Sequence, residues 1–340
     1  MNYSVSHEFG LYTLGNDVVY DQIVALVNSI RCNVDREIPI CIVPYDDRVA
    51  RLQAYIDRTE NVMLFSDRDA IARWENFADK TWAAHPKAEE TPQIVGVRKR
   101  AQRRYAAFEG PFEKFVYYDA DSLAMKPLDA LFAKLAEFEF VFDDWEPRKP
   151  DAVAALRLDR VEASGEYTRE FLRPRLHCSS FFGARRGLFD AEMLDRLAEL
   201  LVEQREIEWM PAIAEAFMFT YLTLRAGYSQ FNFTVDGKSE EVTGNCADAD
   251  PFVEVDRVLY NADGHKPVHR IHYMNFSSKT FQRLCDGEQT DIPFQNMFLH
   301  YRFLGEPEKQ NQILKPPSLA VKVQRKVNAL TKKVRSKIFS

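Results

Sequence analysis

The sequence predicts an α/β protein with a Rossmann-like, mostly parallel central sheet flanked by helices. Short apolar runs of strand length alternate with amphipathic segments of helix length through the first 145 residues. This alternation is typical of parallel sheets whose connections cross over in the right-handed sense. Hydrophobic residues make up 46% of the 340 residues, which suits one large α/β domain or two modest ones with a sizeable buried core.

Three strand–helix pairs are expected at the start of the chain. The apolar runs predict strands at 9–14, 38–43 and 61–65, and apolar residues spaced by three and four predict helices at 18–30, 49–56 and 67–78. Gly15-Asn16-Asp17 is a turn that also caps a helix. The first turn has no Gly-x-Gly-x-x-Gly pattern and no Walker A motif, which argues against a dinucleotide-binding or P-loop protein.

Residues 80–97 are expected to be a loop, and a helix is expected to begin at Arg98. Five cations lie within the seven residues 98–104. They form either a solvated helix face or a group from which one or two arginines, such as Arg100 and Arg103, reach the phosphates of a bound ligand.

An apolar strand at 115–118 leads into two carboxylates, Asp119 and Asp121. Residues i and i+2 of an extended chain point the same way, so both carboxylates face one point. They repel one another unless a cation lies between them, and a hard divalent ion such as Mg2+ or Mn2+ prefers oxygen ligands of this kind. The carboxyl edge of a parallel sheet is also where open α/β proteins bind ligands.

The following elements place further acidic residues near strand or helix ends. A strand at 138–142 ends in Asp143-Asp144, a pair that is either functional or a solvated turn. Charge-rich residues 147–175 predict an insertion or loop that closes over a substrate. A strand is expected at 177–184, followed by helices at 188–204 and 211–225, the second of which carries Glu215 among apolar residues, as a ligand-binding or a structural carboxylate.

A late segment supplies a candidate third metal ligand. Alternation along 268–272 places Arg270 and His272 on one face, and Lys279 follows His272 by seven residues in a loop rich in serine and asparagine. This histidine is either structural or a metal ligand, with Lys279 as a phosphate cation. Imidazole ligation favours Mn2+ over Mg2+.

Composition limits the kinds of partner that the protein is expected to bind and the compartment in which it is expected to lie. The formal net charge is −6, which argues against a nucleic-acid-binding protein. The five cysteines are scattered, without Cys-x-x-Cys spacing, as expected for a reducing compartment. Neither a signal peptide nor an apolar stretch of membrane-spanning length is recognisable. We therefore expect a cytoplasmic location.

The tail, residues 315–340, is basic and amphipathic. Residues 318–340 hold seven lysines and arginines and no acidic residue, so the rest of the chain carries −13. Apolar residues recur at spacings of four and three from Val323 to Ile338, which predicts one helical stripe. Such a helix lies on an anionic membrane surface, docks on the acidic body or forms a coiled-coil seam, and we favour the peripheral membrane position.

Three stretches together resemble the glycogenin-like family 8 glycosyltransferases of the GT-A fold, over about residues 8–285. Tyr12 to Asp17 resembles the family's nucleotide-binding first strand and turn. Lys114 to Asp121 resembles its metal-binding Asp-x-Asp strand, and His272 to Lys279 resembles its late His-x-x-Gly-x-x-Lys loop. In this chain the late loop is one residue longer, and serines replace the asparagine of the family's Asn-x-Gly strand.

The resemblance implies a set of site residues. Asp119, Asp121 and His272 would bind Mn2+ (or Mg2+), and Glu215 and Asp144 are the candidate catalytic carboxylates. The remaining implied residues would bind a nucleotide sugar, with UDP as the nucleotide in the family's manner: Thr13, Leu14, Gly15, Asn16, Arg100, Arg103, Ala120, Ser179, Ser180 and Lys279.

The implied reaction is transfer of a sugar from a nucleoside diphosphate to an acceptor hydroxyl, with retention as in the family. The acceptor is a glycan, a lipid-linked glycan or a protein. Residues 1–314 would form the transferase domain, with a nucleotide-binding half up to about 145 and an acceptor half from 146. Two rival interpretations are a sugar-nucleotide nucleotidyltransferase and a membrane-tethered protein that binds glycans or nucleotides without turnover. The first requires a Gly-rich loop after the first strand, which Gly15-Asn16-Asp17 does not provide.

Overall fold

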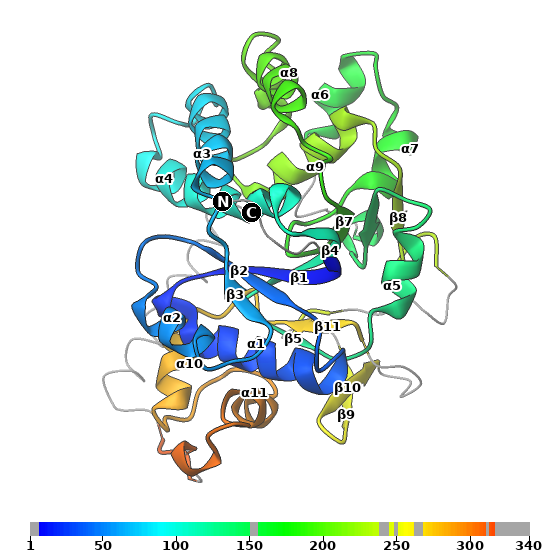
Figure 1. Ribbon diagram of the computed structural model, residues 1–340. Coiled ribbons are helices and arrows are strands. Elements are labelled where there is room, and N and C mark those ends of the chain that lie inside the picture. Colours follow the sequence, from blue (N-terminus) through cyan, green and yellow to red (C-terminus); the bar gives the residue numbers. More distant parts are fainter. Residues whose placement is uncertain are drawn as a thin grey trace.

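The computed structural model describes residues 7–149, 156–237, 245–247, 251–261, 268–310 and 313–316. A seven-stranded sheet in the order β3-β2-β1-β4-β7-β6-β8 forms its centre (Figure 1). β7 runs antiparallel to both of its neighbours, and the other adjacent pairs are parallel. The seven strands are β1 (His7–Gly15), β2 (Ile40–Pro44), β3 (Val62–Leu64), β4 (Phe112–Asp119), β6 (Phe140–Phe142), β7 (Phe181–Arg185) and β8 (Gln230–Asn232).

Two small antiparallel sheets accompany the large one. β5 (Ser122–Ala124) pairs with β11 (Arg270–His272), and β9 (Phe252–Val255) forms a hairpin with β10 (Val258–Asn261). The predicted α/β class with a mostly parallel sheet is confirmed. The large sheet takes strands from both of the halves that the sequence predicted, because β7 and β8 follow residue 146.

Helices cover both faces of the large sheet (Figure 1). On one side lie α3 (Arg68–Ala83), α4 (Pro92–Ala101), α8 (Ala191–Val202) and α9 (Glu215–Ala226). On the other lie α1 (Tyr20–Asn33), α2 (Ala50–Ile56) and α5 (Asp129–Lys134). Two short helices, α6 (Leu158–Ala163) and α7 (Arg169–Leu172), lie within the predicted insertion, of which residues 150–155 lie outside the described residues.

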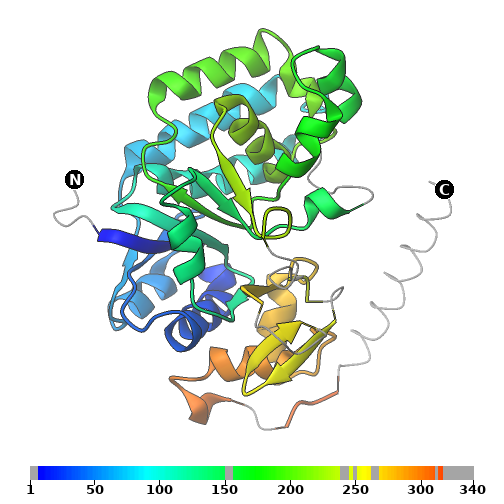
Figure 2. The same ribbon diagram turned by 90° about the vertical axis from the view of Figure 1, so that its right-hand side faces the viewer.

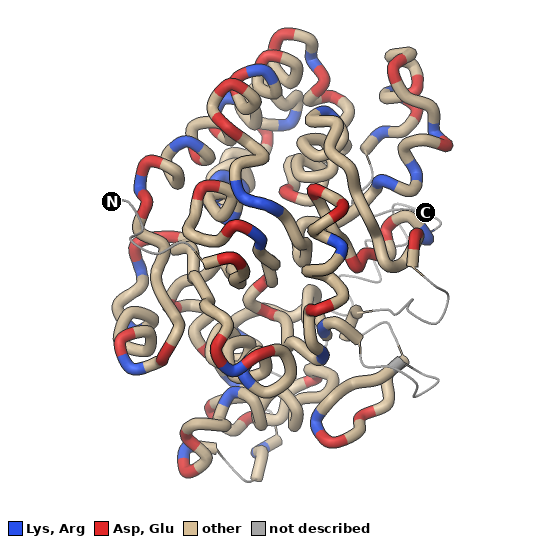
Figure 3. Tube along the Cα trace, turned by 45° about the vertical axis from the view of Figure 1, so that its right-hand side comes forward, with Lys and Arg blue, Asp and Glu red and all other residues tan. Residues whose placement is uncertain are grey.

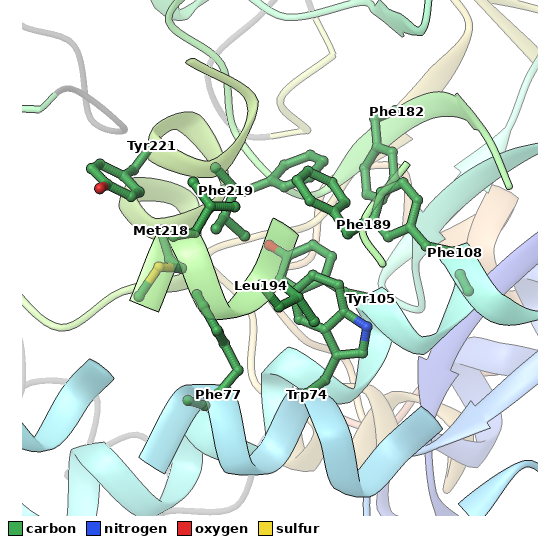
Figure 4. Packing of buried hydrophobic residues seen from close by; sticks show 14 of the residues in the cluster. Trp74, Phe77, Tyr105, Phe108, Phe182, Phe189, Leu194, Met218, Phe219 and Tyr221 are labelled. Carbon is green, nitrogen blue, oxygen red and sulfur yellow. The ribbon is translucent and has the colours of Figure 1, made fainter. Parts of the chain in front are cut away.

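Strand alternation explains why the sheet has a core on each face. In β4, Phe115 and Tyr117 join the cluster under α3, α8 and α9, whereas Val116 and Tyr118 join the cluster under α1 and α2. Figure 4 shows the first cluster, in which the Trp74 ring of α3 packs against the rings of Tyr105, Phe108 and Phe189. The aromatic rings on this face therefore fix β4 between two helical layers.

A third core lies beyond α1. It joins the β5–β11 sheet to α10 (Ser278–Cys285) and α11 (Gln295–Arg302), and the orange α11 lies below the blue α1 in Figure 2. Asn28 of α1 donates to the Tyr301 carbonyl oxygen at 2.7 Å, and Arg302 Nε lies 2.6 Å from Asp21 Oδ1. These contacts fasten the late segment that carries His272 to the first helix of the chain.

The expectation for residues 80–104 was wrong in two respects. α3 continues to Ala83, and α4 begins at Pro92, inside the expected loop. The cations therefore end a helix instead of opening one, which is the end that the helix dipole favours for positive charge. Proline at the first helical turn marks the true start, because its missing N–H has no partner to lose there.

Charged residues of both signs are spread along the described chain (Figure 3). In the view of Figure 3, acidic and basic positions alternate along the outer helices and do not gather by sign. No helix among the described residues has both the length and the apolar character needed to cross a membrane. The predicted tail helix falls within residues 317–340, which lie outside the described residues.

Candidate metal and donor site

The acidic pair lies where β4 leaves the sheet. Asp119 is the last residue of β4, its N–H donates to the Ser180 carbonyl oxygen at 2.9 Å, and β5 begins at Ser122 after a short turn. The side chains of Asp119 and Asp121 are each 24% exposed. The turn therefore presents both carboxylates at the carboxyl edge of a central strand, as the sequence predicted.

β11 carries His272 to the same point. It pairs with β5 so that His272 lies opposite Ser122, and the Tyr273 N–H donates to the Asp121 carbonyl oxygen at 2.9 Å. His272 Nε2 lies 3.3 Å from Asp121 Oδ1 and 3.9 Å from Asp119 Oδ2. A residue 151 positions after Asp121 is thus part of the same cluster.

The donor set fits a divalent cation. One ligand atom from each of Asp119, Asp121 and His272 lies within 4.8 Å of the other two. Two carboxylate oxygens and one imidazole nitrogen match the preferences of Mn2+. Three protein ligands do not fill the coordination shell of such an ion, so positions would be left for water or for oxygens of a ligand. These residues would hold such an ion.

Asp119 has two further partners that the sequence analysis missed. Arg104 Nη1 and the Tyr117 hydroxyl each donate to Asp119 Oδ1 at 2.9 Å. Arg104 also donates to the Ser179 carbonyl oxygen at 3.1 Å. Both residues had a usable signal, because Tyr117 precedes Asp119 by two strand positions and Arg104 follows Arg100 by one helical turn.

The pKa values of the two aspartates shift in opposite directions. Burial raises the pKa of Asp119, and the positive charge of Arg104 only partly offsets this. Burial also favours the neutral form of Asp121, but the charge and hydrogen bond of His272 lower the pKa of Asp121 overall. Asp121 is therefore the more readily ionised member of the pair.

A cavity of about 330 Å³ opens over the pair. Ala120 lies in its lining between the two aspartates, and the β1 end contributes Leu14, Gly15 and Asn16. β1 and β4 bring these together because Leu14 lies opposite Asp119 in the parallel register. The structure thus unites the first-strand turn with the acidic pair, which are about 100 positions apart in the sequence.

The Asn16 amide is already engaged. Its Oδ1 accepts from the Val18 N–H at 3.0 Å and so caps the turn, and its Nδ2 donates to Asp46 Oδ1 at 2.9 Å. Thr13 is buried beneath the cavity lining, and its hydroxyl has no hydrogen-bond partner among the described residues. Asn16 therefore shapes the cavity wall, while Thr13 lies behind it.

Arg100 and Arg103, the two arginines predicted to reach the phosphates of a ligand, lie in different surroundings. Arg100 lies with its guanidinium carbon 5.6 Å from the ring centre of Tyr45, a residue of the cavity wall. Arg103 instead pairs with Glu75 at 2.7 Å and lines a different cavity, of about 820 Å³, between α2 and α3. Arg104, next to it in the sequence, is the arginine that contacts Asp119.

Ser179 and Ser180 border the site through their backbone carbonyls, which accept from Arg104 and from the Asp119 N–H respectively. The Ser180 hydroxyl also accepts from Arg270 Nη2 at 3.1 Å. Lys279 is exposed in the first turn of α10, next to Ser278, which lines the cavity. The serines are thus brought to the acidic pair, whereas Lys279 is next in sequence to a lining residue but does not line the cavity itself.

Glu215 lies in a chain of alternating charges. It is the first residue of α9, is 8% exposed, forms an ion pair with Arg98 of α4, and lies 4.0 Å from Arg104 Nη2. A carboxylate in the first turn of a helix is favoured by the helix dipole. Glu215 is therefore connected to Asp119 through Arg104.

Asp144 lies outside the cavity lining and is engaged by the backbone. Its Oδ1 accepts from the Glu146 N–H at 2.9 Å, and its Oδ2 accepts from the Cys178 N–H at 3.0 Å. Burial raises the pKa of Asp144, although these two hydrogen bonds oppose the rise. Its neighbour Asp143 is also buried and contacts His269 Nδ1 at 2.8 Å.

No family model matches the sequence, and no curated protein sequence matches it. Several solved structures have a similar fold. Mouse xyloside xylosyltransferase 1 in its apo form is 10% identical, with a TM-score of 0.48 over 66% of this chain and 84% of that one. The galactosyltransferase LgtC, in complex with donor and acceptor sugar analogues, is 11% identical, with a TM-score of 0.47 over 86% and 95%. The bifunctional glycosyltransferase WbbM is 13% identical, with a TM-score of 0.48 over 91% of this chain and 53% of its own.

Proposed function

We propose that this chain is a metal-dependent glycosyltransferase of the GT-A fold. It transfers a sugar from a nucleoside diphosphate, UDP in our proposal, to an acceptor hydroxyl with retention of configuration. The observation that carries the proposal is the convergence of Asp119, Asp121 and His272 beside a cavity whose other wall is the β1 turn. The resemblance of the same three stretches to family 8 glycosyltransferases supports it.

The charges of the site suit an anionic donor. Asp119, Asp121 and Glu215 carry three negative charges against the two positive charges of Arg98 and Arg104. A divalent ion turns this net −1 into +1, so the metal-bound site attracts a diphosphate that the metal-free site repels. Binding of ion and nucleotide is therefore expected to be mutually dependent.

In the proposed reaction, negative charge develops on the leaving diphosphate oxygens. A bound Mn2+ would stabilise that charge as a Lewis acid. Asp119, Asp121 and His272 would hold the ion, Leu14 to Asn16 would form the wall for the nucleoside, and Lys279, next to the lining residue Ser278, would supply a cation for the phosphates. Glu215 and Asp144 stay our candidate carboxylates on the sugar side, and Arg100 our candidate donor contact.

The test is a thermal-shift titration of the full chain with UDP, GDP and ADP, each with and without Mn2+. At a nucleotide concentration about 100 times Kd, binding stabilises the native state by about 2.7 kcal/mol. We expect a Mn2+-dependent shift that is largest for UDP. The matched variant Asp121→Asn removes one ligand charge and is expected to lose the Mn2+-dependent part of the shift.

Absence of a shift with any nucleotide, or an equal shift without Mn2+, would contradict the donor site. A Mn2+-dependent UDP shift without transfer or hydrolysis of any UDP-sugar would instead favour a binding protein without turnover.

We also propose that residues 315–340 attach the enzyme to the cytoplasmic surface of an anionic membrane, where a lipid-linked glycan is the acceptor. The seven cations of residues 318–340 and the apolar stripe of the tail support this. Lys315 pairs its backbone with Gly287 and Gln289, so a chain ending at Pro316 keeps that contact. Co-sedimentation with anionic vesicles should be lost in the shortened chain, and unchanged binding would contradict the membrane role.

A further inference from the structure

The two oxygens of Asp119 have different surroundings. Oδ1 accepts hydrogen bonds from both the Tyr117 hydroxyl and Arg104 Nη1, each at 2.9 Å. Oδ2 is the oxygen that lies 3.9 Å from His272 Nε2, on the side of the other candidate ligands. With two donors on Oδ1, one carboxylate oxygen is directed into the metal cluster and the other is held away from it.

Both donors are themselves fixed in place. Arg104 has a side chain that is only 8% exposed, donates from Nε to the Ala101 carbonyl oxygen at 3.0 Å, and bonds the Ser179 carbonyl oxygen. Tyr117 is fully buried and stacks on Phe182 with ring centres 5.3 Å apart. Neither donor can follow Asp119 if its carboxylate rotates, so the pair defines one orientation of that carboxylate.

We propose that Tyr117 and Arg104 are positioning residues which hold Asp119 as a one-oxygen metal ligand through Oδ2. The inference rests on the metal site of the proposed function and assigns two residues that act on the ion only through Asp119. Without these donors the carboxylate rotates freely and must be ordered when the ion binds. Partners of this kind typically contribute 10- to 100-fold to metal affinity.

The position of Arg104 adds a second reason for its presence. Among the described residues it is the only guanidinium that contacts the acidic pair directly, and its Nη2 also lies 4.0 Å from Glu215 Oε1. It therefore offsets the repulsion between Asp119 and Asp121 without occupying the space between them, which stays open for the ion. Lysine would keep the charge but could not hold the Asp119 oxygen and the Ser179 carbonyl in one rigid fork.

The chain offers a matched pair of variants. Tyr117→Phe removes the hydroxyl that contacts Asp119. Tyr118→Phe removes the same atom from the next residue, which is equally buried but points to the opposite face of β4 and has no hydrogen-bond partner for its hydroxyl among the described residues. Arg104→Lys serves as the conservative variant of the second donor.

Mn2+ affinity of the full chain is measured by the electron paramagnetic resonance signal of the free ion, which disappears on binding. We expect Tyr117→Phe and Arg104→Lys each to raise the Kd for Mn2+ about 10-fold or more. Tyr118→Phe is expected to leave it within about twofold. Urea unfolding of each variant confirms that the protein is folded under the titration conditions.

A Tyr117→Phe variant that loses stability but keeps the wild-type Kd would overturn the inference, because the hydroxyl would then serve the fold alone. An equal rise in Kd for Tyr118→Phe would overturn it as well. Wild-type protein that binds no Mn2+ would refute the metal site and the inference together. A Tyr117-specific loss of Mn2+ affinity in a protein that transfers no sugar would refute only the transferase.

Discussion

At the residue scale, the metal cluster was predictable and its supporting residues were not recognised. Strand periodicity places Asp119 and Asp121 on one side of the chain, and the late His–Lys spacing singles out His272. The choice between Arg103 and Arg104 depends on the 3-10 turn Gln102–Glu109, which follows α4 and rotates successive side chains differently from an α-helix. Helical periodicity alone does not choose between them, because residues three and four positions after Arg100 both lie on its face of a helix.

The structural role of Asp144, which follows β6, can be measured as an effect on stability. In Asp144→Asn, the new amide NH2 replaces an oxygen that accepts from a backbone N–H, so a buried donor faces another donor. We expect the free energy of unfolding to fall by about 1–3 kcal/mol in urea titrations.

The exposed Asp47→Asn is the control and should change the free energy of unfolding by less than about 0.5 kcal/mol. If Asp144→Asn abolishes sugar transfer without any loss of stability, the catalytic prediction for Asp144 gains over the structural one.

At the element scale, apolar strands were located well, and their pairing was not predictable in full. Six of the seven large-sheet strands overlap a predicted strand, because burial on both faces requires continuous hydrophobicity, and β8 was not predicted. β7 is antiparallel, and an apolar run carries no signal for strand direction. The prediction of a loop at 80–97 was wrong because α4 has few buried residues, so its sequence lacks the apolar stripe that indicates a helix.

Gly183 is a sensitive position in β7. A Cβ atom built there would lie 2.5 Å from Leu131 Cδ2 of α5, too close for any real contact. Gly183→Ala must displace the buried Leu131 side chain, and we expect a loss of about 1–3 kcal/mol in the free energy of unfolding.

Gly96 in α4 is the matched control, because a Cβ atom there meets nothing within 4 Å. Gly96→Ala should stabilise the protein by about 0.5–1 kcal/mol, since alanine loses less backbone entropy in a helix. Equal effects of the two substitutions in thermal or urea unfolding would contradict the close packing of α5 on β7.

At the scale of the whole molecule, the two-sided sheet was predictable from alternation of strands and helices. The third core under α1 was not, because its residues come from short segments around Leu123, Ile271 and Phe298 that show no long periodic pattern. The same core supplies β11, which carries the candidate ligand His272, so the least predictable part of the fold completes the best-predicted part of the candidate site.

Acid should destabilise the whole protein through His177. Burial lowers the pKa of His177 to about 3 in the folded state, from about 6.5 in the unfolded chain. The unfolded state therefore binds a proton that the folded state excludes, and stability falls as the pH drops from about 6.5 toward 3. Between about pH 7.5 and about pH 5.5 the expected loss is about 1.4 kcal/mol.

His177→Gln removes this proton-binding difference while keeping a polar group near Thr223, whose hydroxyl lies 2.7 Å from His177 Nε2. Urea unfolding at the two pH values should show a smaller loss for the variant than for the wild type. Parallel losses would show that His177 does not carry this part of the acid sensitivity.

The separation of the metal ligands along the chain sets an order of events during synthesis. The seven strands of the large sheet are all contained within residues 7–232, whereas His272 emerges from the ribosome later. All seven strands of the large sheet and both aspartates are therefore synthesised before the third ligand of the proposed metal site. A ribosome that stops before Arg270 leaves a chain without His272, and so without the complete set of candidate ligands.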